Sequence, residues 1–130
     1  MAKPTFVDGI DSTTFMPFSL IDARGTECND IRLQFDDWAW LDEKYNTEYI
    51  NDYYLNGGNV QGLVLAARVA AGLDACADGM ELNSDGNTCF IHFKELQVAV
   101  HTAELAQKMI NDRDEISRLA DIAREHDFED

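Results

Sequence analysis

The sequence predicts an α+β fold in which an antiparallel sheet of about four or more strands packs against helices, in the order β-β-α-α-β-β-α-α. Two pairs of short segments alternate apolar and polar residues around turn-rich loops, and each pair is followed by two segments with helical spacing of apolar residues. The chain has 130 residues, 45% of them hydrophobic, which is enough for one continuous core. No repeat or linker interrupts it, so residues 1–130 are expected to form a single α+β domain.

The first pair of strands is expected at Thr13–Ala23 and Asn29–Trp38. Pro17 removes one donor from the hydrogen-bond ladder, which predicts that the first strand lies at an edge of the sheet or carries a bulge. In the second strand every other residue from Ile31 to Phe35 is apolar, the pattern of a half-exposed strand. Turn-forming residues between the two strands indicate a hairpin.

A helix is predicted over Asp42–Leu55, with Asp42 as its cap. Tyr45, Tyr49 and Tyr53 recur every four residues within it and so fall near one helix face. Tyr49 and Tyr53 are therefore expected in the core.

A second helix is predicted over Asn59–Asp74, where apolar residues occupy nearly all sides. Asn59 is its expected N-cap and Gly72 its expected end. A helix this apolar and rich in alanine should pack closely against the sheet.

The C-terminal half repeats the pattern of a hairpin followed by two helices. Gly79–Phe93 is expected to form the hairpin around the turn residues Ser84–Asn87. Lys94–Ile110 and Asn111–Phe128 have the apolar spacing of amphipathic helices, and Asp112 is the expected cap of the second.

The charge balance narrows the classes of partner. The chain carries 25 Asp and Glu against 10 Lys and Arg, a formal net charge of -15. Such a surface repels nucleic-acid phosphates and anionic membrane headgroups and attracts basic proteins. We therefore expect a protein partner with a basic surface, no nucleic-acid partner and no membrane partner, although solubility alone would also account for the acidity.

The cysteines and the apolar runs indicate a cytoplasmic protein. Cys28, Cys76 and Cys89 are odd in number and widely spaced, which fits reduced thiols better than a disulfide framework. The first residues contain no apolar stretch typical of a signal peptide, and no run approaches the ~20 apolar residues of a membrane span.

No motif supplies a catalytic or cofactor-binding set. Asn83–Asn87 (NSDGN) has part of the composition of a calcium loop but runs directly into a strand, which favours a hairpin turn. Leu55–Asn59 (LNGGN) lacks the Lys-Ser/Thr of a phosphate-binding loop. Cys89 and His92 lie three residues apart on a predicted strand, so their side chains face opposite sides. We expect no enzyme activity, no cofactor and no metal, while the many paired carboxylates leave a small carboxylate-based hydrolase open as an alternative.

The strongest functional pattern is Phe35–Asn59, which we call the acidic-aromatic segment. It places six Trp and Tyr side chains among carboxylates, and neighbouring aromatics such as Tyr53 and Tyr54 cannot both point inward. Some aromatic area should therefore reach solvent, where Tyr and Trp act as binding anchors and carboxylates steer a basic partner. The residues predicted to bind the partner are Asp36, Asp37, Trp38, Trp40, Tyr45, Glu48, Asp52 and Tyr54.

The chain also resembles the immunity proteins of bacterial polymorphic toxin systems, specifically the immunity protein 51 family. The stretches that carry the resemblance are FMPFSLID (Phe15–Asp22), NGGNVQGLVLAARVAA (Asn56–Ala71) and LNSDGNTCFIHFKELQVAVHTAELAQKMI (Leu82–Ile110). In place of the family's usual aromatic residue after the glycine turn, this chain has Val60-Gln61.

The resemblance implies a non-enzymatic protein that binds a cognate toxin domain in the cytoplasm and neutralises it. Many such toxins are nucleases with basic clefts, which suits an acidic inhibitor. An alternative is an acidic nucleic-acid mimic that inhibits a DNA-binding protein, with carboxylates spaced like phosphates along an elongated surface.

Overall fold

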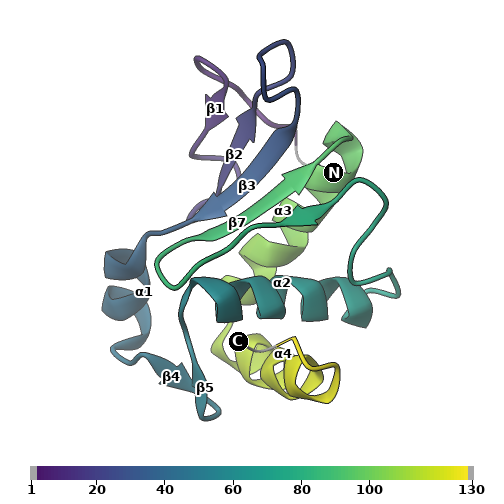
Figure 1. The fold of residues 1–130 in the computed structure, drawn as a ribbon. Helices are drawn as coiled ribbons and strands as arrows, with labels where there is room; N and C mark the ends of the chain where they lie inside the picture. The colour runs from purple at the N-terminus through teal and green to yellow at the C-terminus, as the bar shows by residue number, and fades with distance from the viewer. Residues whose placement is uncertain (1–2, 129–130) are drawn as a thin grey trace.

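The computed structural model describes residues 3–128. Within that range the main element is a five-stranded antiparallel sheet with the strand order β1-β2-β3-β7-β6, seen at the top of Figure 1. A two-stranded antiparallel hairpin, β4–β5, lies outside this sheet. The strands are β1 Ile10–Asp11, β2 Ser19–Asp22, β3 Ile31–Phe35, β4 Tyr49–Ile50, β5 Tyr53–Tyr54, β6 Glu81–Leu82 and β7 Cys89–Phe93.

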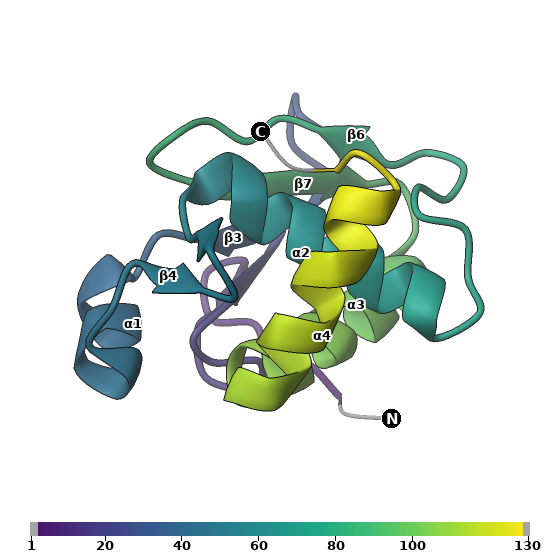
Figure 2. The same cartoon turned by 90° about the horizontal axis from the view of Figure 1, so that it is seen from below.

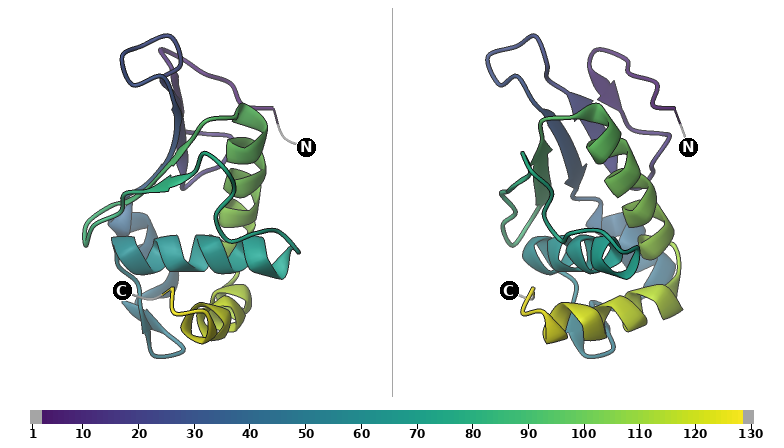
Figure 3. Two further views of the ribbon diagram at one scale, coloured as in Figure 1. Left: turned by 45° about the vertical axis from the view of Figure 1, so that its right-hand side comes forward. Right: turned by 90° about the vertical axis from the view of Figure 1, so that its right-hand side faces the viewer.

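Four helices within the described range complete the fold: α1 Trp38–Tyr45, α2 Gly57–Ala70, α3 Leu96–Ile110 and α4 Arg113–Glu125. Helices α2 and α3 pack against one face of the sheet, as the two views of Figure 3 show. Helix α4 packs on the side of α2 that faces away from the sheet, and it crosses in front of α2 in Figure 2. The predicted α+β fold is confirmed, and α2 is enclosed between β7 and α4.

The alternation of the central strands explains why only one face of the sheet is covered. In β3 the side chains of Ile31, Leu33 and Phe35 are buried, whereas those of Arg32 and Gln34 on the opposite face are half-buried. Strand β7 pairs with β3 in register and repeats the same alternation. Period-2 apolar patterning therefore turns one row of each strand toward α2 and α3.

The first predicted strand is shorter than its sequence pattern suggested. Only Ser19–Asp22 forms a strand, because the chain turns just before it: the Phe18 N–H donates to Phe15 O at 2.9 Å, and both rings are buried. Strand β2 lies between β1 and β3, so the prediction of an edge strand is wrong. Pro17, whose preceding peptide bond is cis, lies before the ladder and removes no donor from it.

The predicted helix over Asp42–Leu55 is also wrong. Helix α1 begins four residues earlier than predicted because Asp37 caps it, its Oδ1 accepting a hydrogen bond from Trp40 N at 3.1 Å. The helix ends where Asn46 adopts a left-handed conformation with φ 52°. The C-terminal half of the predicted helix is replaced by the β4–β5 hairpin.

The β4–β5 hairpin separates the tyrosines that the helical spacing grouped. Asn51 and Asp52 between the strands have φ of 56° and 59°, as in a type I′ turn. The resulting register pairs Tyr49 with Tyr54 and turns Tyr53 to the other face. Tyr53 is 1% exposed, as predicted for the core, whereas Tyr49 is 54% exposed and its assignment to the core is wrong.

Helix α2 begins two residues earlier than the predicted cap. Asn56 caps it by accepting a hydrogen bond from Asn59 N at 2.8 Å. Asn59 is therefore not the cap, and its side-chain amide donates to Tyr54 O at 2.8 Å instead. The end of the helix is as predicted, since Gly72 follows it with a φ of 82°.

The C-terminal half follows the sequence prediction closely. Strands β6 and β7 form the expected hairpin, and α3 and α4 begin two residues inside their predicted bounds. Asp112 caps α4, accepting hydrogen bonds from the N–H groups of Asp114 and Glu115 at 3.0 and 3.3 Å. The buried stripe of α4 is the predicted one: Ile116, Leu119, Ala120 and Ala123.

Gly57 allows α2 to start directly against the loop of residues 83–88. Its N–H donates to Gly86 O at 3.3 Å. A Cβ at position 57 would lie 2.0 Å from Asp85 O and 2.6 Å from Thr88 O, and both are backbone atoms that cannot rotate away. The loop and the helix start therefore fit together only with glycine at this position.

We predict that Gly57→Ala lowers the free energy of unfolding by about 2 kcal/mol or more, because the backbone collision outweighs the better helix propensity of alanine. Urea unfolding followed by circular dichroism measures the change. Gly86→Ala is the matched control, since a Cβ there meets nothing within 4 Å. An alanine at position 57 that leaves stability equal or raised would contradict the close approach.

Asp11 fixes the loop that leads into β2. Its fully buried carboxylate accepts hydrogen bonds from the backbone N–H groups of Thr5, Thr13 and Thr14 at 2.8, 3.0 and 2.9 Å. Burial raises the pKa of Asp11, but hydrogen bonds from Thr14, Thr5 and Thr13 lower it by more, to about 2. The folded protein therefore holds this carboxylate ionised below the ordinary pKa of 3.8.

Because the pKa of Asp11 is lower in the folded than in the unfolded chain, its stabilisation is complete above pH ~4 and is lost as the pH falls to ~2. We predict that Asp11→Asn lowers the free energy of unfolding at pH 7 by about 2 kcal/mol. The difference between wild type and variant should shrink between pH ~4 and ~2. Asp8→Asn, at an exposed residue with left-handed φ, is the control. A difference that does not depend on pH would contradict the role of the charge.

Candidate partner-binding site

A hollow of about 440 Å³ opens where α1, the β4–β5 hairpin, the start of α2 and the β6–β7 loop meet. These segments lie together at the lower left of Figure 1. We call this hollow the Trp38 pocket. The residues that line it are Trp38, Ala39, Leu41, Asp42, Thr47, Glu48, Tyr54, Leu55, Asn56, Gly86 and Asn87.

Trp38 forms a fixed wall of the pocket. It is the first residue of α1, three residues after the last core residue of β3, and its ring packs edge-to-face on Phe35 at a centroid distance of 5.0 Å. Its indole Nε1–H donates to Asn87 O at 2.7 Å. The indole is thus held between the sheet and the β6–β7 loop while part of it stays exposed.

Tyr54 is the second aromatic wall and pairs with Tyr49 across the hairpin. Their ring centroids lie 5.2 Å apart, and the side chains are 41% and 54% exposed. The sequence prediction missed Tyr49 as a surface residue. An alternating pattern around a two-residue Asn-Asp turn was the signal that could have identified it.

Asp42 on α1 and Glu48 before β4 supply the carboxylates of the pocket. Both are exposed. The sequence alone did not indicate that either carboxylate lies beside Trp38. Among the described residues that line the pocket, none is Lys, Arg or His. The pocket therefore combines two aromatic side chains with two carboxylates.

Of the eight predicted partner-binding residues, three line the pocket together: Trp38, Glu48 and Tyr54. Asp36 and Asp37 lie between β3 and α1, where Asp37 serves as the helix cap. Asp52 lies at the tip of the hairpin, outside the pocket lining.

The remaining two predicted residues, Trp40 and Tyr45, have partners within the chain. The ammonium group of Lys44 lies 5.6 Å from the ring centroid of Trp40 and 5.8 Å from that of Tyr45. The Tyr45 hydroxyl donates to Ile110 O at 2.6 Å, and burial raises the pKa of this phenol. Tyr45 therefore ties α1 to the end of α3.

The hairpin that carries Tyr54 is held against α4. The side-chain amide of Asn51 donates to Ser117 O at 2.9 Å and to Asp121 Oδ1 at 3.0 Å. Arg124 donates to Asn51 O, and its guanidinium lies 5.5 Å from the ring centroid of Tyr53. These contacts hold the wall of the pocket in place relative to the helical layer.

Other polar groups form structural pairs away from the pocket. On the open face of the sheet, Asp30 contacts Arg32 Nε at 3.0 Å and His92 Nδ1 at 2.8 Å. Cys89 lies on the buried face, where burial raises its thiol pKa to about 12. The prediction that Cys89 and His92 face opposite sides is confirmed. Within residues 3–128, no three His, Cys, Asp or Glu side chains are grouped so that they could hold a metal ion.

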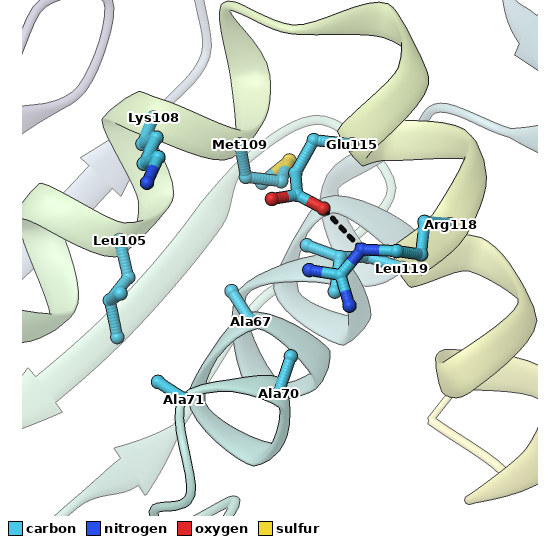
Figure 4. A pocket seen from close by; sticks show the side chains of 9 residues that line it. All are labelled: Ala67, Ala70, Ala71, Leu105, Lys108, Met109, Glu115, Arg118 and Leu119. Atoms are coloured by element: carbon cyan, nitrogen blue, oxygen red, sulfur yellow. Dashed lines mark hydrogen bonds and ion pairs between the residues drawn. The ribbon is translucent and has the colours of Figure 1, made fainter.

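A second, smaller hollow of about 170 Å³ lies between α2, α3 and α4 (Figure 4). Ala67 and Ala70 of α2 and the following Ala71 form one side of it, and Glu115 and Arg118 of α4 project over it. Its one carboxylate already pairs with Arg118, the Nε and Oε1 atoms lying 2.5 Å apart. Lys108 is the other charged side chain of the lining, so this hollow presents no carboxylate apart from the one paired with Arg118 to a basic partner.

Comparisons with protein-family models, curated proteins and solved structures give no match to the chain. Among the described residues, the helices are too short or too polar for any of them to cross a lipid bilayer.

We predict that Tyr45→Phe lowers the free energy of unfolding by about 1 kcal/mol, because it leaves the acceptor at Ile110 without its hydroxyl donor. Thermal unfolding of the purified variant measures this. Tyr49→Phe, at a residue that is 54% exposed, should leave stability unchanged and serves as the control. Equal stability of both variants would mean that α1 is not anchored through Tyr45.

Proposed function

We propose that this protein is an immunity protein that binds and neutralises a cognate bacterial toxin domain with a basic surface. The observation that carries the proposal is the Trp38 pocket, where two aromatic side chains and two carboxylates line one hollow on a chain of net charge -15. The toxin would bind across the acidic-aromatic segment, on α1 and the β4–β5 hairpin, in the cytoplasm of the producing cell.

The physical chemistry of this surface supports a binder of proteins. Tyr and Trp contribute large contact areas with few rotatable bonds, so they lose little conformational entropy on binding. The Tyr49–Tyr54 pair and the partly exposed indole of Trp38 offer such area. Surrounding carboxylates accelerate the encounter with a positively charged surface.

The choice of a toxin domain rests on the resemblance to the immunity protein 51 family. The three stretches that carry it fall on β2, on α2 and on the run from β6 to α3, which are elements of the core. The partner-binding segment lies mainly between the first two stretches. A scaffold that carries the resemblance, with recognition on a separate segment, suits a family whose members each meet a different toxin.

Two observations favour this proposal over the alternatives. Only two carboxylates line the pocket, and they share it with two aromatic side chains, whereas a nucleic-acid mimic needs carboxylates in phosphate-like rows. Within residues 3–128, the carboxyl groups with a clearly shifted pKa are Asp11, Asp22 and Asp30, and all three shifts are downward. A hydrolytic general acid needs an upward shift, so these groups suit structural or charge-bearing roles.

We predict that affinity capture from the native bacterium, with this protein as bait, recovers one stoichiometric basic partner that carries a toxin domain. Coexpression of the two proteins in a bacterial host should then restore growth that the toxin alone arrests. A partner that is harmless to cells, or a toxin that still kills in the presence of the protein, would refute the proposed function.

The binding surface is tested by Tyr54→Ala, which should weaken binding of the toxin by at least about tenfold because an aromatic anchor is lost. Leu82→Ala on β6 is the matched control, since Leu82 and Tyr54 are both 41% exposed. Isothermal titration calorimetry measures both affinities. Equal affinities would place the interface elsewhere on the molecule.

A further inference from the structure

We propose that the Trp38 pocket is the subsite for a single arginine side chain of the partner protein. This inference rests on the proposed function and names the group that the site recognises. The volume of about 440 Å³ falls within the range of about 300–1,000 Å³ that is typical of ligand pockets. The hollow is therefore large enough to take one long side chain from a docked protein.

The lining matches the parts of an arginine side chain. Leu41 and Leu55 are both nearly fully buried and give the pocket an apolar base, against which an aliphatic stem can pack. The rings of Trp38 and Tyr54 offer π surfaces for a cation. Asp42 and Glu48, which also line the pocket, can accept hydrogen bonds from the charged end.

The neighbouring aromatics support the assignment of a cation. The rings of Trp40 and Tyr45 already face the Lys44 ammonium, and the ring of Tyr53 faces the Arg124 guanidinium. The described residues that line the Trp38 pocket include no basic side chain, so its carboxylates are available to a cation from outside. In a complex, the partner would supply the charge that Lys44 and Arg124 supply to the neighbouring rings.

Arginine fits better than lysine for two physical reasons. Its planar guanidinium stacks on aromatic rings and gives up hydration water more readily than an ammonium group. It also donates several hydrogen bonds in one plane, which suits carboxylates on two different segments. Lysine would present a compact, strongly hydrated point charge to the same site.

The test uses three capped tripeptides that differ only at the central residue, which is arginine, lysine or citrulline. Each is titrated into the 15N-labelled full chain while the two tryptophan indole signals are followed by NMR. Trp38 lines the pocket and Trp40 does not, so Trp40 is an internal reference, assigned with Trp40→Phe. We expect the arginine peptide to shift the Trp38 signal and to bind at least about threefold tighter than the lysine peptide. The citrulline peptide, which is neutral, should leave both signals unchanged.

Matched charge variants separate the pocket from the general acidity of the chain. Glu48→Gln and Glu43→Gln remove the same charge, but Glu43 does not line the pocket although it is exposed on α1. Glu48→Gln should weaken binding of the arginine peptide at least about fivefold, and Glu43→Gln less than about twofold. Equal effects of the two variants, equal shifts of both indoles, or equal binding of the arginine and citrulline peptides would each overturn the subsite.

The subsite and the proposed function fail in different ways. If the arginine peptide binds at Trp38 but no toxin is neutralised, the subsite stands and the immunity function is wrong. If a toxin is neutralised and binds equally well to wild type and to Glu48→Gln, the function stands and the arginine subsite is wrong.

Discussion

The arrangement of the whole molecule depends on the enclosure of helix α2 between the sheet and α4. Two glycines make this possible. Gly57 lies against the β6–β7 loop. At Gly62, a Cβ would lie 2.7 Å from the Tyr53 hydroxyl and 2.7 Å from the backbone oxygen of Phe128. The Tyr53 hydroxyl in turn donates to Asn59 O at 2.9 Å. Because β5 leads directly into α2, the seating of this helix also fixes where Tyr54 emerges.

The candidate site follows from this packing. One wall of the Trp38 pocket is held by the β6–β7 loop, which contacts the start of α2, and the other by the hairpin that precedes the same helix. The aromatic side chains are therefore positioned before any partner binds, so little entropy is lost on binding. Net charge then adds long-range attraction for a basic protein, and the pocket adds local selection for one side chain.

The sequence predicted the fold class and the C-terminal half well because those segments have regular periods and strong caps, such as Asp112 and the stripe of α4. It failed between residues 38 and 56, where tyrosines at four-residue spacing imitated a helix. The hairpin prevails there because Asn51 and Asp52 take left-handed conformations and the Asn51 side chain bonds to α4. The pocket itself was not predictable, since Asn87 joins it from a loop 49 residues away from Trp38.

The central claim is that the face around the Trp38 pocket meets a basic partner protein. Site-specific photo-crosslinking in the native bacterium tests it most directly, with p-benzoyl-phenylalanine incorporated in place of Tyr54 or, separately, of Leu82. The two positions are equally exposed, at 41%. The account predicts one crosslinked adduct from position 54, to a basic protein with a toxin domain, and none from position 82. The same adduct from position 82 alone would contradict it.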